Sequence, residues 1–286
     1  MTSSPGGPGG LAGVLVLVGT PIGNLGDLSP RAVEVLAAAD TIACEDTRRT
    51  RALLSHLGVS GAGRLVAVHD HNEAASVGDV LRRLDRGQRV AVVTDAGMPG
   101  ISDPGERLVA AAAAAGHAVE VVPGPSALVA ALVVSGLSTS RFCFEGFLPR
   151  KGAARSQRLA EVAAEPRTVV LFEAPPRVRQ TVADLIGAAG ADRRVTVARE
   201  LTKLHEEVWR GTLAGAVDHL ASREPRGEYV LVLDGAPPID PAGETDVEAA
   251  LRSRLGAGLD KRSAIAEVAT TLRVPKRLVY DVALRL

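Results

Sequence analysis

The chain has 286 residues, which is enough for one large domain or two of medium size. Hydrophobic residues make up 46% of it and aromatic residues only 2%, so the core has to be built from alanine, valine and leucine, and rings are too scarce for a nucleic-acid platform based on stacking. Basic and acidic residues number 33 each, so the total charge singles out no partner and local clusters have to be considered instead.

The N-terminal region contains an apolar run, LAGVLVLVG at 11–19, that resembles a short membrane-targeting segment. It is too short to span a bilayer. No basic residue precedes it and no small-residue cleavage site follows it, which argues against a signal peptide. We therefore expect a disordered tail over 1–12, a buried strand behind it and no association with a membrane.

Two cysteines, Cys44 and Cys143, each lie inside an apolar stretch. Such positions are typical of small, buried, reduced side chains rather than of a disulfide or a redox site. This interpretation predicts a cytoplasmic protein.

Apolar runs alternate with helix-like segments in the first part of the chain. Ser29 and Pro30 are placed to begin one helix as N-cap and first helical residue, and Asp103 and Pro104 repeat the pattern before a helix that ends at Gly116. The runs typical of buried strands are 14–19, 41–45, 65–69, 90–95 and 118–124. Strands and helices in turn predict an α/β domain with a largely parallel sheet.

A second α/β block and a helical end follow the basic segment that begins near residue 145. We expect strands within 168–177, 194–200, 206–211 and 228–235 and helices near 176–189 and 212–222. Two amphipathic helices around the break RVPKR, 273–277, suggest a small helix-turn-helix. The expected boundaries are a tail 1–12, an N-terminal domain 13–125, a second domain 126–235, a linker 236–246 and a helical unit 247–286.

Four unusual loops follow expected strands, at 19–24, 44–50, 94–105 and 123–127. Ligands of open α/β sheets bind at the carboxyl ends of the strands, so these loops are expected to converge. The 94–105 loop combines three glycines with two prolines, which indicates a backbone shaped to lie against a ligand. Neither a P-loop nor a G-x-G-x-x-G fingerprint is present, and the loops hold no lysine, so the ligand is expected to lack phosphate. The helix start at Ser126 suits a carboxylate.

Seven motifs together resemble a known family: GTPIGNLGDLSPRA, ACEDTRRTRALL, HDHNE, VTDAGMPGISDPG, VPGPSA, FEAPPR and RELTKLHEE. The chain resembles the family of 16S ribosomal RNA cytidine 2′-O-methyltransferases, ribosomal small-subunit methyltransferase I, within the tetrapyrrole-methylase-like, class III group. The motifs cover roughly three quarters of the chain. The resemblance implies two α/β domains with S-adenosylmethionine in the cleft between them, a homodimer, and 16S rRNA of the small ribosomal subunit as substrate.

S-adenosylmethionine carries an adenosine, a sulfonium and an amino acid tail but no phosphate, which agrees with the phosphate-free loops. By resemblance, its contacts are assigned to Pro21, Asp95, Ala96, Gly97, Ile101, Ser126, Ala127, Leu171 and Gly211. For each position the alternative is a structural turn or a core residue.

The reaction implied is methyl transfer to a ribose hydroxyl, a weak nucleophile that needs a base, a positioned cation or close in-line alignment. The candidate catalytic residues are Glu173, Arg177, Lys203, His205 and Glu206, with Glu45, Asp46 and Arg48 as further candidates. Each of them is also typical of a surface ion pair, and the sequence does not identify the base.

The segment HDHNE, residues 69–73, could ligate a metal through His69, Asp70, His71 and Glu73. Methyl transfer from a sulfonium needs no Lewis acid, and no second cluster of ligands is evident. We therefore expect a polar loop that lines the substrate cleft or a dimer contact, and no metal.

RNA binding by such a chain has to be electrostatic. The candidate contacts are Arg48, Arg49, Arg51, Arg150, Lys151, Arg155, Arg158, Lys276 and Arg277, each of which could equally belong to a solvated face. Two other functions stay open: methylation of a small tetrapyrrole, and a non-enzymatic nucleic-acid-binding module. The basic segments argue against the first and the shaped glycine loops against the second.

Overall fold

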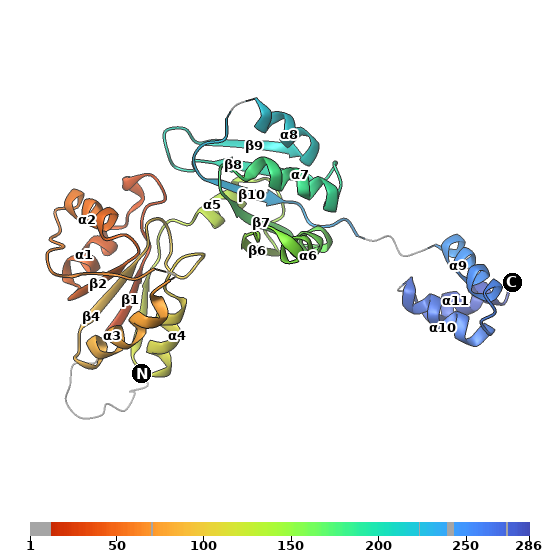
Figure 1. Cartoon of the computed structure of the whole chain (residues 1–286), viewed down its shortest axis with the longest axis horizontal. Coiled ribbons are helices and arrows are strands. Elements are labelled where there is room, and N and C mark those ends of the chain that lie inside the picture. Colours follow the sequence, from red (N-terminus) through yellow and green to blue (C-terminus); the bar gives the residue numbers. More distant parts are fainter. Residues whose placement is uncertain (1–12, 70, 223, 239–242, 273) are drawn as a thin grey trace. The chain divides into compact units, whose positions relative to one another are not determined.

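The computed structural model describes residues 13–69, 71–222, 224–238, 243–272 and 274–286, and the chain divides into two compact units, Met1–Ala236 and Pro237–Leu286. The expected tail 1–12 lies outside the described residues. The larger unit contains two five-stranded sheets with their helices, and the smaller one consists of helices (Figure 1). Each unit is described by itself.

The first sheet of the larger unit is entirely parallel, as predicted. Its strands are β1 (Val14–Val18), β2 (Thr41–Cys44), β3 (Leu65–Ala67), β4 (Arg89–Val93) and β5 (Ala118–Val122), in the order β3-β2-β4-β1-β5. Because β1 and β4 lie in the middle, the loops that follow them leave the same edge of the sheet side by side.

Four helices cover both faces of this sheet, with a 3₁₀ turn, η1 (Leu25–Asp27), after β1. They are α1 (Pro30–Ala38), α2 (Thr47–His56), α3 (Glu73–Asp85) and α4 (Glu106–Ala114). Leu36 of α1 and Leu54 of α2 pack on one face, and Leu84 of α3 and Leu108 of α4 on the other. Small aliphatic side chains therefore fill both layers, as the scarcity of rings requires.

Among the helices of the first sheet, one helix start agrees with the sequence and two differ. Ser29 caps α1, its hydroxyl accepting a hydrogen bond from the Ala32 amide. The prediction of an Asp103 cap was wrong: α4 begins at Glu106, and the carboxylate of Glu73 accepts hydrogen bonds from amides of its first turn. The segment 44–50, expected as a loop, becomes helical at Thr47 because Asp46 caps α2.

The second sheet is mixed. Its strands are β6 (Phe142–Phe147), β7 (Thr168–Glu173), β8 (Arg194–Arg199), β9 (Glu207–Thr212) and β10 (Tyr229–Leu233), in the order β6-β7-β10-β8-β9. Only β6 and β7 pair in parallel; the other pairs are antiparallel. The sequence predicts no strand at β6, because Glu145 and Gly146 interrupt its apolar pattern where the register shifts.

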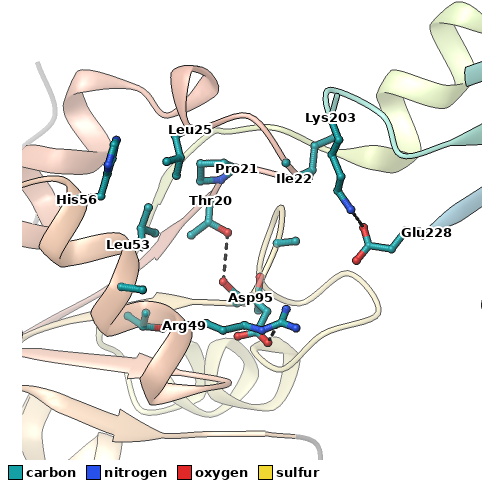
Figure 2. Close-up of a pocket in the computed structure, with 15 residues that line it drawn as sticks. Thr20, Pro21, Ile22, Leu25, Arg49, Leu53, His56, Asp95, Lys203 and Glu228 are labelled. Atoms are coloured by element: carbon teal, nitrogen blue, oxygen red, sulfur yellow. Dashed lines mark hydrogen bonds and ion pairs between the residues drawn. The ribbon is translucent and has the colours of Figure 1, made fainter. Parts of the chain in front are cut away.

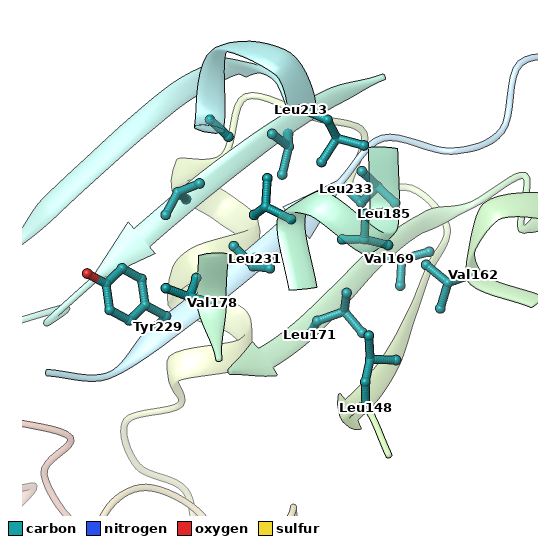
Figure 3. Packing of buried hydrophobic residues seen from close by; sticks show 14 of the residues in the cluster. Leu148, Val162, Val169, Leu171, Val178, Leu185, Leu213, Tyr229, Leu231 and Leu233 are labelled. Atoms are coloured by element: carbon teal, nitrogen blue, oxygen red, sulfur yellow. The ribbon is translucent and has the colours of Figure 1, made fainter. Parts of the chain in front are cut away.

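Helices cover both faces of this sheet as well: α5 (Ala127–Val134) on one, and α6 (Gly152–Ala164), α7 (Val178–Ala189) and α8 (Leu213–Ala221) on the other. Leu171, Leu185, Leu213 and Leu231 belong to the core on the three-helix face (Figure 3). Since successive residues of a strand face opposite sides, the neighbours of Leu171 on β7, Val170 and Phe172, face α5.

The smaller unit contains three helices where the sequence predicts two. They are α9 (Glu244–Gly256), α10 (Lys261–Thr271) and α11 (Lys276–Ala283), packed around a core that includes Val247, Ile265 and Val279. The expected linker 236–246 was therefore too long, because α9 begins at Glu244. In the parts of the chain that the structure describes, no helix is long and apolar enough to cross a membrane.

Candidate functional site

The loops that follow β1 and β4 are joined through their backbones. The Thr20 amide donates to the Gly97 carbonyl at 2.9 Å, and the Gly97 amide donates to the Thr20 carbonyl at 3.2 Å. Gly97 has φ +87, a conformation that side chains rarely adopt. The 123–127 loop joins them, because a Cβ on Gly19 would lie 2.6 Å from the Gly124 Cα. The fourth predicted loop, 44–50, also meets them: the Asp46 amide donates to Asp95 Oδ1 at 3.2 Å, and the Asp95 amide donates to Glu45 Oε2 at 3.3 Å. All four predicted loops thus converge, as expected.

A cavity of about 310 Å³, here called the acidic cavity, lies against these loops. It falls within the size range of small-molecule sites. Its lining includes Ile22, Ala96, Gly97, Ile101, Asp103, Ser126, Ala127, Phe147, Phe172, Glu173, Glu228 and Tyr229. Three of these are carboxylates, and none of the described lining residues is lysine, arginine or histidine. Such a lining favours a ligand with positive charge and an apolar ring, and disfavours phosphate.

A second cavity of about 410 Å³, here called the mixed-charge cavity, is also lined by the loops after β1 and β4 (Figure 2). Its lining includes Thr20, Pro21, Ile22, Leu25, Arg49, Ala52, Leu53, His56, Asp95, Ala96, Lys203 and Glu228. Ile22, Ala96 and Glu228 line both cavities. Ligands in the two cavities would therefore meet at these three residues.

One ion pair of the mixed-charge cavity joins Arg49 of α2 to Asp95. Arg49 Nη1 lies 3.3 Å from Asp95 Oδ2, while Asp95 Oδ1 accepts a hydrogen bond from the Asp46 amide at 3.2 Å. Burial raises the pKa of Asp95, and the Arg49 charge opposes this only in part. The guanidinium remains 69% exposed and can reach a ligand.

The other ion pair comes from a strained loop between β8 and β9. Glu200 and Thr202 have φ +51 and +67 although neither is glycine, and such backbone strain clusters at functional sites. Thr202 Oγ1 accepts a hydrogen bond from the Asn24 amide at 3.2 Å, which ties this loop to the one after β1. Lys203 Nζ lies 2.8 Å from Glu200 Oε1 and 3.0 Å from Glu228 Oε2.

Lys203 is held as a cation. Burial would lower its pKa, but the hydrogen bonds to Glu200 and Glu228 outweigh burial and the pKa is raised. A protonated amine cannot accept a proton, so this candidate suits the role of a positioned cation rather than that of a general base.

Comparisons with known proteins place this architecture. The family model for tetrapyrrole (corrin/porphyrin) methylases matches residues 14–217. The chain is 47% identical over 276 residues to the ribosomal RNA small subunit methyltransferase I of Synechocystis, covering 96% of this chain and 98% of that protein. It is 45% identical to that of Mycobacterium tuberculosis, covering 96% and 95%, and 42% identical to that of Escherichia coli O157:H7, covering 95% of each.

The chain belongs to the ribosomal RNA small subunit methyltransferase I family. Among solved structures it resembles the cobalamin biosynthetic cobalt precorrin-4 methyltransferase at a TM-score of 0.56 and 18% identity, covering 78% of this chain and 95% of that one. It also resembles the uroporphyrin-III-C-methyltransferase from Thermus thermophilus at 0.52 and 21%, covering 77% and 94%. These likenesses show the tetrapyrrole-methylase fold that the resemblance implies, and this chain has two five-stranded sheets.

Most of the cofactor contacts expected from the family gather at the two cavities. Ala96, Gly97, Ile101, Ser126 and Ala127 line the acidic cavity. Pro21 and Asp95 line the mixed-charge cavity, where Ala96 also contributes. The hydroxyl of Ser126 caps α5 by accepting a hydrogen bond from the Val129 amide.

Two expected contacts lie elsewhere. The Leu171 side chain is fully buried in the core beneath α6–α8, and Phe172, one residue on, faces the acidic cavity instead, so any contact at position 171 is left to its backbone. Gly211 lines a third cavity that shares no lining residue with the acidic one. A Cβ on Gly211 would lie 2.5 Å from the Trp209 ring, which gives this glycine a packing role.

The candidate catalytic residues are not brought together. Glu173 lines the acidic cavity but is only 2% exposed; it accepts a hydrogen bond from Thr181 Oγ1 at 2.6 Å and lies 3.3 Å from Arg177 Nε. His205 and Glu206 are exposed, and neither lines either cavity. The Glu206 carboxylate accepts a hydrogen bond from the Thr202 amide, which helps to hold the strained loop. A structural role therefore accounts for Glu173, Arg177 and Glu206.

The expected RNA contacts differ in availability. Arg155 is buried, lies 2.6 Å from Asp184 and donates to Thr181, so the prediction that it contacts RNA is contradicted. Arg158 pairs with Glu145 at 2.8 Å. The remaining candidates are exposed: Arg48, Arg49 and Arg51 on α2, Arg150 and Lys151 before α6, and Lys276 and Arg277 at the start of α11.

The HDHNE segment has a structural account. Glu73 caps α4, as described above, and Asn72 accepts a hydrogen bond from the His69 amide at 2.8 Å. Asp70 lies outside the described residues. Among the residues that are described, no group of three side chains could hold a metal ion. Sequence reasoning missed this capping role because Glu73 and α4 lie 32 residues apart.

Proposed function

We propose that this protein transfers a methyl group from S-adenosylmethionine to the ribose 2′-hydroxyl of one cytidine in the decoding region of 16S rRNA. The relatives' names support a small-subunit rRNA methyltransferase. The observation that carries the site is the pair of cavities that share Ile22, Ala96 and Glu228. Such a junction suits a reaction in which a donor and an acceptor meet from opposite sides.

The acidic cavity fits the cofactor. Bound there, S-adenosylmethionine would supply an electrophilic methyl group, whose bond to sulfur breaks as its bond to oxygen forms. Asp103 and Glu228 favour its sulfonium and ammonium charges, while Phe147, Phe172 and Ile101 offer apolar surface for its adenine. Gly97 and Ala96 let the loop backbone come close to the ligand.

The chain's own residues align the acceptor rather than activate it strongly. Asp95 precedes the shared residue Ala96 and lines the mixed-charge cavity, where its carboxylate can accept a hydrogen bond from the hydroxyl. Lys203, held as a cation, offsets the negative charge of the approaching RNA. Methyl transfer to a hydroxyl releases one proton, which passes to water or to a carboxylate.

We also propose a homodimer. Apolar side chains are exposed on two elements of the larger unit that follow one another in the chain: Val121 on the edge strand β5 is 53% exposed and Val133 on α5 is 63% exposed. Surfaces of this kind mark protein–protein contacts. Sedimentation velocity checks this proposal, and a monomer at micromolar concentration would contradict it.

A labelled-methyl assay tests the function. Free 16S rRNA, small subunits from cells that lack the enzyme, and a tetrapyrrole precursor are offered side by side. We expect label on a cytidine ribose, faster in subunits than in free RNA, because the protein has few rings with which to unstack bases. Label in the tetrapyrrole or on a base would overturn the proposal. Absence of any transfer, with RNA binding retained, would favour a non-enzymatic module.

A further inference from the structure

We infer that the mixed-charge cavity is the acceptor site and holds one unstacked nucleotide of the RNA, with the Arg49 guanidinium on its phosphate. This inference rests on the proposed function and goes further, because it assigns a place and a contact to the substrate. Four observations carry it: the shared wall, the charge of a competing cavity, the lining and the volume.

The shared wall restricts where the acceptor can enter. The reacting oxygen has to come within roughly 3–3.5 Å of the methyl carbon before transfer. Ile22, Ala96 and Glu228 belong to both the acidic and the mixed-charge cavity, so atoms at this point are reachable from each. An acceptor in the mixed-charge cavity therefore lies next to a donor in the acidic cavity, with the shared residues Ile22, Ala96 and Glu228 in reach of both.

Another cavity that adjoins the acidic cavity has a lining whose charge disfavours RNA. It shares Ser102, Asp103 and Phe147 with the acidic cavity and is lined by Glu73, Asp103 and Glu106 against Arg107 as its basic residue. Three carboxylates near one guanidinium repel a phosphate. The mixed-charge cavity instead presents Arg49, His56 and Lys203 against Asp95 and Glu228.

The lining of the mixed-charge cavity has the two components that a nucleotide needs. Pro21, Leu25 and Leu53 offer an apolar surface to a base and a ribose. Arg49 is 69% exposed at the edge of the cavity, and its planar fork matches a phosphate. Lys203 is tied to two carboxylates, so Arg49 is the cation best placed to leave its partner, Asp95, for a phosphate.

The volume indicates how much RNA can enter. A cavity of about 410 Å³ accommodates one nucleotide but no paired segment. Enzymes that need such access take the target nucleotide out of its stack, at a cost that is lowest where it is already unpaired. The cavity thus selects an accessible, unpaired position on a preformed surface, in keeping with an assembled subunit as substrate.

The first test compares two arginines with similar surroundings. Arg49 and Arg82 each lie 3.3 Å from an aspartate and are 69% and 63% exposed, but only Arg49 lines a described cavity. We expect Arg49→Ala to raise the KM for small subunits about tenfold and to reduce the salt slope of RNA binding by about 0.7, the contribution of one single-strand phosphate contact. Arg82→Ala should leave both unchanged, and Arg49→Lys should restore part of the loss.

The second test fills the cavity. Ala52 lines it from α2, whereas Ser55, exposed on the same helix, does not. Both positions are exposed, so the fold should tolerate a large side chain at each. We expect Ala52→Trp to lower kcat/KM for small subunits at least tenfold, because the ring fills the cavity, and Ser55→Trp to change it less than twofold. Calorimetry with S-adenosylmethionine should give the same Kd for all variants within twofold.

The outcomes separate this inference from the proposed function. If Arg49→Ala and Arg82→Ala behave alike, or if Ala52→Trp methylates subunits at the normal rate, the acceptor lies elsewhere although the enzyme is still a methyltransferase. If Arg49→Ala or Ala52→Trp weakens cofactor binding tenfold, the mixed-charge cavity belongs to the cofactor and the inference is overturned. If the unaltered protein transfers no label to RNA, the proposed function itself has failed.

Discussion

The acidic cavity and the mixed-charge cavity share a wall but differ in almost every property of their linings. One has carboxylates and aromatic edges without a basic side chain among its described residues; the other has arginine, histidine and lysine set against aspartate and glutamate. Three residues, Ile22, Ala96 and Glu228, line both. The difference teaches that two adjacent cavities lined by the same loops can carry different charge, because the residues that they do not share differ.

The largest effect is expected from a change in the 95–97 loop, at Gly97, which lines the acidic cavity. Gly97→Val forces a β-branched residue into φ +87, which costs about 1–3 kcal/mol of backbone strain. The cost comes from the backbone and not from a steric clash, because the added Cβ would lie at ordinary contact distances of 3.4 and 3.6 Å from Ile22 and Pro125. We expect calorimetry to show S-adenosylmethionine binding weakened roughly ten- to hundredfold.

The matched control for this variant is Gly116→Val. Gly116 has φ +80, and a Cβ added to it would meet no atom within 4 Å. It follows α4 in the chain and lines neither cavity. It should lose stability on thermal unfolding to a similar degree yet keep the cofactor affinity. Equal affinities for the two variants would show that the 95–97 loop does not touch the cofactor.

A smaller effect is expected when the helical unit is removed. Residues 237–286 form a separate unit with its own core, so their deletion should leave cofactor binding intact. Binding of small subunits should weaken about tenfold, with a shallower salt dependence, because exposed cations such as Lys276 and Arg277 are lost. The cut belongs before α9, which begins at Glu244. Loss of cofactor binding in the truncated protein would contradict the division.

The smallest expected effect is a pH dependence of the KM for small subunits, which should appear at the mixed-charge cavity and not at the acidic one. Because burial raises the pKa of Asp95, this carboxyl takes up its proton at a higher pH than an ordinary aspartate, and Arg49 then loses its competing partner. As the pH falls and Asp95 takes up its proton, the KM for small subunits should fall about two- to threefold, because an exposed ion pair contributes little free energy.

The control for the pH prediction is Asp95→Asn. This variant should show the lower KM at every pH, with a flat profile, because the amide carries no charge to lose. Cofactor affinity should not follow the same curve. A pH profile that persists in Asp95→Asn would assign the titration to another group.

The sequence was a good guide wherever local rules decide the structure. Ser29 and Ser126 cap helices as their positions predict, the strands of the first sheet are parallel, and the loops after β1 and β4 meet at Gly97. In each case the signal, a hydrophobic period, a capping residue or a glycine, lies within a few residues of the structure that it predicts.

The failures came where partners are distant in sequence or where alternation has to be counted. Glu73 replaces Asp103 at the start of α4 from 32 residues away. Leu171 faces the core while Phe172 faces the cavity, a difference that depends on the register of β7. Arg155 is buried against Asp184 on another helix, so a basic run that suggests RNA contacts also contains a structural ion pair.

The bridge between Thr20 and Gly97 has a consequence for how such proteins diversify. Its two hydrogen bonds, at 2.9 and 3.2 Å, join peptide groups, and every amino acid but proline supplies the same amide and carbonyl. Except at Gly97, whose φ of +87 favours glycine, substitutions among the side chains of either cavity therefore leave these two hydrogen bonds in place. Proteins of this fold can therefore change the residues that contact the acceptor while the two loops keep their alignment.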